Sequence, residues 1–231
     1  MTFEVLADAE ATALRAAGII AQDARAAVAV RGRFTMAVSG GHTPWTMLRA
    51  LANEDVPWAG VHIFQVDERV APAGDPDRNL THLHESLLEH APISREQIHA
   101  MPVEMPDLEA AAKQYSRTLT GIAGIPAVLD LVHLGLGPDG HTASLVPGDP
   151  VLNITDSDVG VTGVYMGRRR MTLTYPILNR SRKILWLVTG SEKVEMLPCL
   201  RAGDQTIPAG RVSREQAVVL ADRPAVGESA A

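Results

Sequence analysis

The stretch FTMAVSGGHTP, at positions 34–44, joins a short apolar run to a glycine turn and the start of a helix. The run FTMAV, at 34–38, predicts a buried strand. Ser39, Gly40 and Gly41 end that strand. Thr43-Pro44 predicts a helix to about residue 51, since proline fits the first turn of a helix. A strand that leads directly into a helix is typical of α/β proteins.

The same alternation of strands and helices continues along the chain. Helical spacing and capping signals predict helices at 8–31, 79–89, 107–120 and 191–200. Apolar runs predict further strands at 61–66, 128–134, 171–175, 184–189 and 217–221. Strands separated by helices favour a parallel sheet covered on both faces. Because no repeat and no linker interrupts the pattern, we expect residues 1–231 to form one domain.

The composition is that of a globular protein with a large core. The chain has 231 residues, 46% of them apolar and 21% charged, with a net charge of −6. These values argue against a disordered chain, and the acidic balance offers no basic face to a nucleic acid. No apolar run approaches the ~18 residues of a membrane span, and we expect no signal peptide. The single cysteine, Cys199, excludes an internal disulfide. Together these observations predict a cytoplasmic protein without nucleic-acid or membrane partners.

Polar clusters follow four of the predicted strands. They are SGGHT at 39–43, DER at 67–69, GLGPDGHTAS at 135–144 and GSEK at 190–193. In an open parallel sheet, ligands bind beyond the carboxyl ends of the strands. The four clusters are therefore expected to meet at one edge of the sheet.

The first cluster has the character of a phosphate-binding loop. A glycine turn that opens a helix presents backbone N–H groups at the positive helix end, and hydroxyls of Ser39 and Thr43 add donors. A plain tight turn would use glycine in the same way, so this pattern alone leaves both interpretations open. The loop is not a Walker motif, because it lacks the Gly-Lys-Ser/Thr ending.

The third cluster formally matches the dinucleotide fingerprint Gly-x-Gly-x-x-Gly. We reject that interpretation because Pro138 removes a backbone donor and Asp139 places a carboxylate in the turn. The segment also reaches Pro147-Gly148 too soon for a full helix. A turn that presents Asp139 and His141 together fits a general base with an orienting partner. A surface histidine in a loop is the competing interpretation.

Five segments resemble the 6-phosphogluconolactonase family in order and spacing. They are VSGGHTP (38–44), VDERVAP (66–72), LGLGPDGHTASLVPG (134–148), RMTLT (170–174) and LVTGSEK (187–193). The resemblance spans nearly the whole chain. It implies a Rossmann-like three-layer α/β/α fold and the hydrolysis of 6-phospho-D-glucono-1,5-lactone to 6-phosphogluconate. That reaction is the second step of the oxidative pentose phosphate pathway, and the family needs no cofactor.

The resemblance also implies roles for residues of this chain. His141 matches the residue that activates water, and Asp139 is its neighbour in the site. Arg69 belongs to the Asp-Glu-Arg motif and is a candidate donor to the oxyanion, as are backbone N–H groups. The residues matched to substrate and phosphate binding are Ser39, Gly40, Gly41, Thr43, Asp67, Arg170 and Lys193. We expect a monomer that acts on a phosphorylated sugar lactone.

The chain departs from the family pattern in two places. Arg78 stands before Asn79 where serine is usual, which adds a charge expected near the mouth of the site, and Val146 replaces phenylalanine. We expect no metal, because the histidines at 82, 84 and 90 lack metal-ligand spacing. The alternatives are an amino-sugar-phosphate deaminase or isomerase and a non-enzymatic sugar-phosphate sensor on the same fold. The sequence His-Thr-Ala-Ser-Leu, at 141–145, favours the lactonase.

Overall fold

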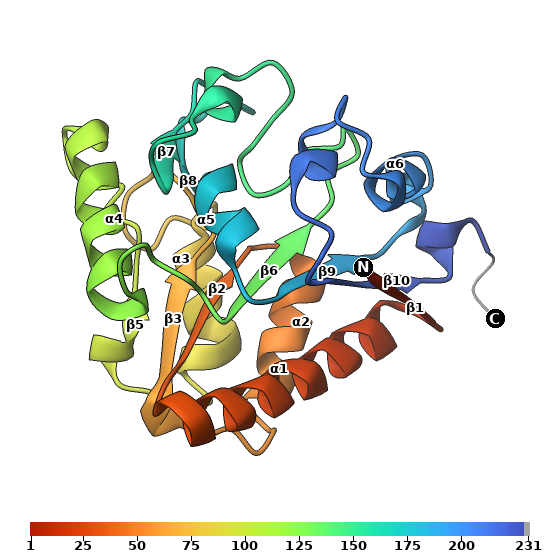
Figure 1. Ribbon diagram of the computed structural model, residues 1–231, viewed down its shortest axis with the longest axis horizontal. Coiled ribbons are helices and arrows are strands. Elements are labelled where there is room, and N and C mark those ends of the chain that lie inside the picture. The colour runs from red at the N-terminus through yellow and green to blue at the C-terminus, as the bar shows by residue number, and fades with distance from the viewer. Residues whose placement is uncertain (229–231) are drawn as a thin grey trace.

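Seven parallel strands form the central sheet of the computed structural model, which describes residues 1–228 (Figure 1). Their order is β1-β10-β9-β6-β2-β3-β5, and every neighbouring pair is parallel. The strands are β1 (Thr2–Leu6), β2 (Phe34–Val38), β3 (Val61–Gln65), β5 (Ile98–His99), β6 (Leu131–Gly135), β9 (Ile184–Val188) and β10 (Ala217–Asp222). The predicted α/β class with a mainly parallel sheet is confirmed.

Helices cover both faces of this sheet and complete the three layers of the expected Rossmann-like sandwich (Figure 1). One face carries α1 (Ala9–Arg31), α2 (His42–Leu51) and α3 (Asn79–Leu83). The other carries α4 (Leu108–Ala123), α5 (Tyr175–Arg180) and α6 (Met196–Ala202). Successive strand residues point to opposite faces, so Met36 enters one core and Ala37 the other. Both are buried, which is why these strands read as unbroken apolar runs.

The first helix, α1, has the two end signals that its sequence predicts. Asp8 caps the helix by accepting the N–H of Ala11 at 2.8 Å. Gly32 ends it at a φ of 72°, in the left-handed region that favours glycine. The strand that precedes it, β1, was not predicted from the sequence.

A second, antiparallel sheet lies beside the parallel one and has the order β4-β8-β7. Its strands are β4 (Asp67–Arg69), β7 (Val159–Val161) and β8 (Arg170–Leu173). The strand predicted at 171–175 is β8, which belongs here, and the DER cluster is a strand of its own. The chain passes between the sheets at Val66, whose N–H donates to Val38 at 2.9 Å while its carbonyl accepts from Leu173 at 2.8 Å.

Two predicted helices are interrupted. The helix expected at 79–89 is α3 followed by a π-helical turn, His84–Leu88. The helix expected at 191–200 is a 3₁₀ turn, Ser191–Lys193, followed by α6. The second break has a plain cause: Pro198 has no N–H for the carbonyl four residues before it, so it fits only the first turn of a helix. No helix within residues 1–228 has the length and apolar character needed to cross a membrane.

Candidate active site

A cavity of about 320 Å³ opens beyond the carboxyl ends of β2, β6 and β9, with β4 and β8 as its other wall. All four sequence clusters contribute to it. Its polar side chains are Ser39, His42, Thr43, Asp67, Arg69, Asn79, His141, Arg170, Thr189, Glu192 and Lys193. The expectation that the clusters meet at one sheet edge is confirmed.

His141 and Asp139 form a hydrogen-bonded pair at the wall of this cavity. Nδ1 of His141 lies 2.5 Å from Asp139 Oδ1, which also accepts the backbone N–H of His141 at 3.1 Å. Partial burial acts to raise the pKa of Asp139, but these bonds and the charge on His141 outweigh it, and the pKa lies below its usual value. The ionised carboxylate holds a proton on Nδ1. Nε2 is then the nitrogen left to act as a base.

The turn that carries this pair is tightly folded. A Cβ on Gly137 would overlap the imidazole of His141, and Gly140 has a φ of 80° with Ile207 against it. The N–H of Gly137 donates to the carbonyl of His141 at 2.8 Å. From 138 to 149 the chain forms turns and one short bridge between Thr142 and Leu145. It forms no helix there, whereas a dinucleotide-binding turn would open a helix, so the rejection of that fingerprint is confirmed.

Two arginines face each other across the antiparallel sheet. Arg69 on β4 is the register partner of Arg170 on β8. Like charges directly opposite each other destabilise a sheet, and the carboxylate of Asp67 lies close enough to both arginines to offset their repulsion. Both arginines line the cavity. This wall of the cavity can therefore accept a further anion.

Asp67 is the buried counter-ion of this wall. Burial raises its pKa, against the opposing effect of a hydrogen bond from Ser144 and the charges of the two arginines. The Ser144 hydroxyl donates to Asp67 Oδ2 at 2.6 Å. Burial also lowers the pKa of Arg170, an effect that Asp67 opposes. The carboxylate is thus fixed by protein contacts before any ligand binds.

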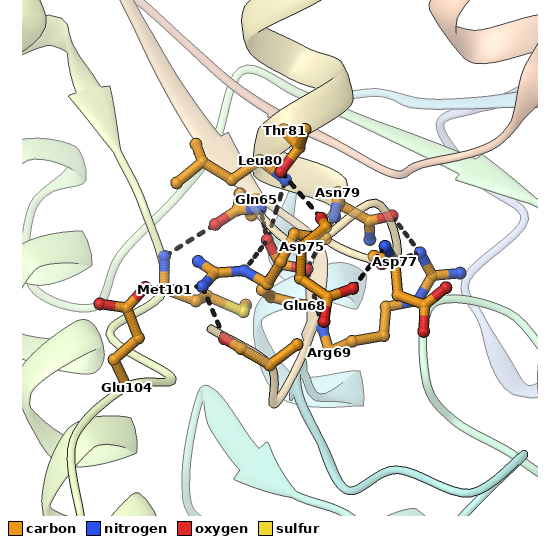
Figure 2. A network of polar contacts seen from close by, with 12 residues as sticks. Gln65, Glu68, Arg69, Asp75, Asp77, Asn79, Leu80, Thr81, Met101 and Glu104 are labelled. Atoms are coloured by element: carbon orange, nitrogen blue, oxygen red, sulfur yellow. Dashed lines mark hydrogen bonds and ion pairs between the residues drawn. The ribbon is translucent and has the colours of Figure 1, made fainter. Parts of the chain in front are cut away.

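Glu68 lies between Asp67 and Arg69 in the sequence but does not line the cavity, because side chains alternate along a strand. Figure 2 shows it among its hydrogen-bond partners. Its side chain is fully buried. Oε1 accepts the backbone N–H groups of Arg69 and Asn79, both at 2.8 Å. Oε2 accepts the Gln65 side-chain amide at 2.8 Å and the Leu80 N–H at 2.9 Å. Glu68 therefore organises the chain behind the cavity wall.

Asn79 connects this network to the cavity. Its Oδ1 accepts a hydrogen bond from Arg69 at 2.8 Å, and its Nδ2 donates to the carbonyl of Asp67 at 2.9 Å. A Cβ on Gly40 would overlap the Asn79 amide, so glycine is required where the first loop passes this side chain. Asn79 thereby fixes the direction of the Arg69 guanidinium.

The expectation that Arg78 adds charge at the mouth of the site is wrong. Arg78 is 3% exposed, and its side chain does not line the cavity. Its Nε lies 3.1 Å from Glu68, and its terminal nitrogen donates to Glu104 at 2.9 Å and to the carbonyl of Ala71 at 3.0 Å. A buried carboxylate such as Glu68 needs a nearby cation, and Arg78 supplies it from behind.

The first loop ends at the amino terminus of α2. Gly41 is the cap residue, with a φ of 129°, and no side chain caps the helix. Among the described residues, the N–H groups of His42 and Thr43 have no protein acceptor. The Ser39 hydroxyl donates to the carbonyl of His133 at 3.0 Å, so backbone N–H groups are the donors left at this end. Free N–H groups at a helix start favour an anion.

Lys193 and Thr189 complete the same end of the cavity. Nζ of Lys193 lies 3.3 Å from the carboxylate of Glu192. The hydroxyls of Thr43 and Thr189 are 2.7 Å apart. Only one hydrogen is needed for that bond, so the pair keeps a second one to donate. Cation, hydroxyl and N–H donors are thus grouped at one end.

The structure brings most of the predicted site residues together. Those on the cavity wall are Ser39, Gly40, Thr43, Asp67, Arg69, His141, Arg170 and Lys193. Gly41 and Asp139 stand behind the wall, one as the helix cap and the other as the partner of His141. The prediction assigned no role to His42, Thr189 or Glu192, which lie inside the segments it used, or to Asn79, which follows Arg78. Tyr165, which contacts Asp139, comes from a stretch with no sequence signal.

Comparison with known proteins finds similarity over most of the chain. Residues 7–220 match the family model described as glucosamine-6-phosphate isomerases/6-phosphogluconolactonase. The chain is 39% identical over 175 residues to a 6-phosphogluconolactonase of Synechocystis sp., covering 74% of this chain and 72% of that protein. It is 37% identical over 217 residues to a 6-phosphogluconolactonase of Mycobacterium tuberculosis, covering 88% of each.

A solved structure of 6-phosphogluconolactonase from Thermotoga maritima is similar across the fold. The TM-score is 0.84 at 27% sequence identity, over 96% of this chain and 98% of that one. Sequence and fold therefore lead to the same group of proteins.

Proposed function

This chain belongs to the glucosamine-6-phosphate isomerase/6-phosphogluconolactonase family, and from that premise we propose that it hydrolyses 6-phospho-D-glucono-1,5-lactone to 6-phospho-D-gluconate. This is a step of the pentose phosphate pathway. The observation that carries the proposal is one cavity with two sets of groups on its wall. One is the imidazole of a hydrogen-bonded His–Asp pair, and the other is a group of N–H, hydroxyl and lysine donors for an anion. We propose the cytoplasm as its location, in line with the single cysteine.

The first step is attack of water on the lactone carbonyl, with His141 as the base. Nε2 of His141 takes a proton from the water as its oxygen bonds to C1. The carbonyl becomes a tetrahedral oxyanion. Asp139 stabilises the imidazolium that forms, because its carboxylate is already bonded to Nδ1.

The second step opens the ring. The oxyanion collapses, the bond between C1 and the ring oxygen breaks, and the imidazolium returns its proton to that oxygen. The products are a carboxylic acid and a hydroxyl group on one chain, so no covalent enzyme intermediate is needed. Arg69 is the side chain we propose as donor to the oxyanion, because Asn79 and the carbonyl of Asp77 fix its guanidinium at the cavity wall.

Binding of the phosphate places the carbonyl near His141. We assign the phosphate to the N–H groups of 40–43, the Thr43–Thr189 hydroxyl pair and Lys193, and we place Arg170 beside the substrate. A dianion held at one end limits the positions that the lactone ring can take. Positioning of this kind supplies a large part of the rate enhancement in such reactions.

The direct test is release of acid from freshly generated 6-phosphogluconolactone. We expect acid release faster than the spontaneous rate, which is measured in buffer and subtracted. Glucosamine 6-phosphate serves as the second substrate, with release of ammonia as its readout. Ammonia release without faster lactone opening would overturn the lactonase proposal in favour of a deaminase.

A further inference from the structure

One aromatic side chain contacts the His–Asp pair and has no part in the reaction proposed above. The hydroxyl of Tyr165 donates to Asp139 Oδ2 at 3.3 Å. Its ring meets the His141 imidazole edge-on, with centroids 5.7 Å apart and planes at 66°. On its other side, the Arg170 guanidinium carbon lies 5.0 Å from the ring centroid. Tyr165 thus contacts three residues of the site at once.

A tight turn holds Tyr165 in this place. Tyr165 and Arg168 exchange backbone hydrogen bonds of 2.9 and 3.3 Å across a two-residue turn. Met166 and Gly167, the two turn residues, have φ values of 50° and 80°. Positive φ at both positions is typical of the type I′ turn, a two-residue connection between antiparallel strands. The Tyr165–Arg168 turn therefore points the aromatic ring in a defined direction.

Arg168 fastens the same turn to the loop that follows β4. Its Nε donates to the Asp77 carboxylate at 2.9 Å, and a terminal nitrogen donates to Asp75 at 3.2 Å. The carbonyl of Asp77 also accepts a bond from Arg69, at 2.8 Å. The turn that carries Tyr165 and the loop that holds Arg69 are thus tied to each other.

We propose that Tyr165 is a positioning residue that fixes the Asp139 carboxylate, and through it the His141 imidazole, in the orientation for attack on the lactone. The kinetic part of this inference rests on the proposed function. Among the described residues, His141 donates two hydrogen bonds to Oδ1 of Asp139, and the Tyr165 bond at Oδ2 adds a second point of attachment that opposes rotation of the carboxylate. The Tyr165 ring packs beside the imidazole and limits its tilt.

The phenol is a suitable donor for this role. Burial, and then the negative charge of Asp139, raise the pKa of Tyr165, so the hydroxyl keeps the proton that it donates. The bond of 3.3 Å is longer than an ordinary O–H···O bond. We therefore expect a moderate effect when the bond is removed, and not loss of activity.

The test compares Tyr165→Phe with Tyr175→Phe. Tyr175 donates its hydroxyl to the carbonyl of Pro208, so the control also loses one tyrosine hydrogen bond, but on α5. The first readout is the pKa of His141 by NMR titration of its ring, which needs no substrate. The ionisable groups in contact with it among the described residues are Asp139, from the same turn, and Tyr165, whose ring also lies against Arg170.

Loss of the phenol donor leaves more of the Asp139 charge to stabilise the imidazolium. We expect Tyr165→Phe to raise the pKa of His141 by about half a unit and to lower kcat about three- to tenfold at unchanged KM. The acid limb of the pH profile then moves to higher pH, because the base is neutral only above its pKa. Arg168→Gln, which keeps the phenol but frees the turn, should give a smaller change in the same direction.

An unchanged His141 titration with an unchanged kcat in Tyr165→Phe would overturn the positioning role. Packing alone predicts that outcome, since phenylalanine keeps the ring. If the wild-type protein fails to open the lactone while the His141 titration still shifts, the proposed function is wrong and the positioning role stands.

Discussion

The two sides of β4 use charged residues in opposite ways. Behind the strand, Glu68 is fully buried, accepts four hydrogen bonds and pairs with Arg78 (Figure 2). In front of it, Arg69 and Arg170 face each other on the wall of the cavity, which Arg78 does not reach. The strand alternation alone sends neighbouring residues to these two environments.

The difference separates charges that hold the fold from charges that await a ligand. A buried carboxylate with all its acceptor sites filled has little left to offer a substrate, whereas a pair of opposed cations is relieved when an anion binds. Removing a charge on the rear side should therefore lower the free energy of unfolding, and removing one on the cavity side should change ligand affinity or the reaction rate. Four substitutions on the two sides of the strand test that division.

His141→Ala should lower kcat for the lactone by about 10²–10⁴-fold, because a general base is removed, while the protein stays folded. The measurement is acid release corrected for spontaneous opening, with a thermal melt beside it. His84→Ala, an exposed histidine outside the cavity, is the matched control. Near-normal turnover in a folded His141→Ala protein would remove this residue from the role of base.

Glu68→Gln should reduce the free energy of unfolding by about 3–5 kcal/mol. Both oxygens of Glu68 accept N–H groups, so the amide NH₂ of glutamine would face donors in either orientation. Urea unfolding measures the loss. The control is Glu104→Gln, which removes the exposed partner of Arg78 and should cost no more than about 1 kcal/mol. Equal stability in both variants would contradict the role given to the rear network.

Lys193→Ala should raise KM for the phosphorylated lactone about 10–100-fold, the value of a lost charge-assisted hydrogen bond. It should change KM for glucono-1,5-lactone, which has no phosphate, far less. Steady-state kinetics on both substrates measure this difference. Equal effects on the two lactones would place the phosphate elsewhere.

Glu192→Gln should have the smallest effect, and in the opposite direction. Glu192 is the carboxylate 3.3 Å from Lys193, so it competes with a bound anion for that cation. Because Glu192 is mostly exposed, we expect affinity for 6-phosphogluconate to improve only about two- to threefold. Weaker binding in this variant would show that the carboxylate contacts the ligand directly.

The sequence was sufficient for five strands of the parallel sheet, β2, β3, β6, β9 and β10, and for most of the residues that line the cavity, because both depend on local patterns; the edge strands β1 and β5 were missed. Apolar runs followed by glycine turns placed the strands, and the chemistry lay at the strand ends, as the positions of Ser39 and Gly135 illustrate. The DGHT segment, at 139–142, already contained the His–Asp pair, since a separation of two residues within a turn brings the side chains together.

The second sheet and the rear network were not predicted, because both depend on contacts between distant segments. Nothing near Arg78 indicates that its side chain turns inward to Glu68, ten residues earlier. The pairing of Arg69 with Arg170 joins segments about a hundred residues apart. Tyr165 acts on Asp139 only because the Tyr165–Arg168 turn folds back over the site, and short turns of this kind have weak sequence signals.

The most direct test of the division between the two sides is calorimetric titration of the wild-type protein with 6-phosphogluconate and with gluconate. The two ligands differ only in the phosphate, so their difference in affinity isolates the unpaired donors of the cavity. We expect one site for 6-phosphogluconate, an affinity that falls as salt rises, and binding of gluconate at least about tenfold weaker. Equal affinity for the two ligands would contradict this expectation.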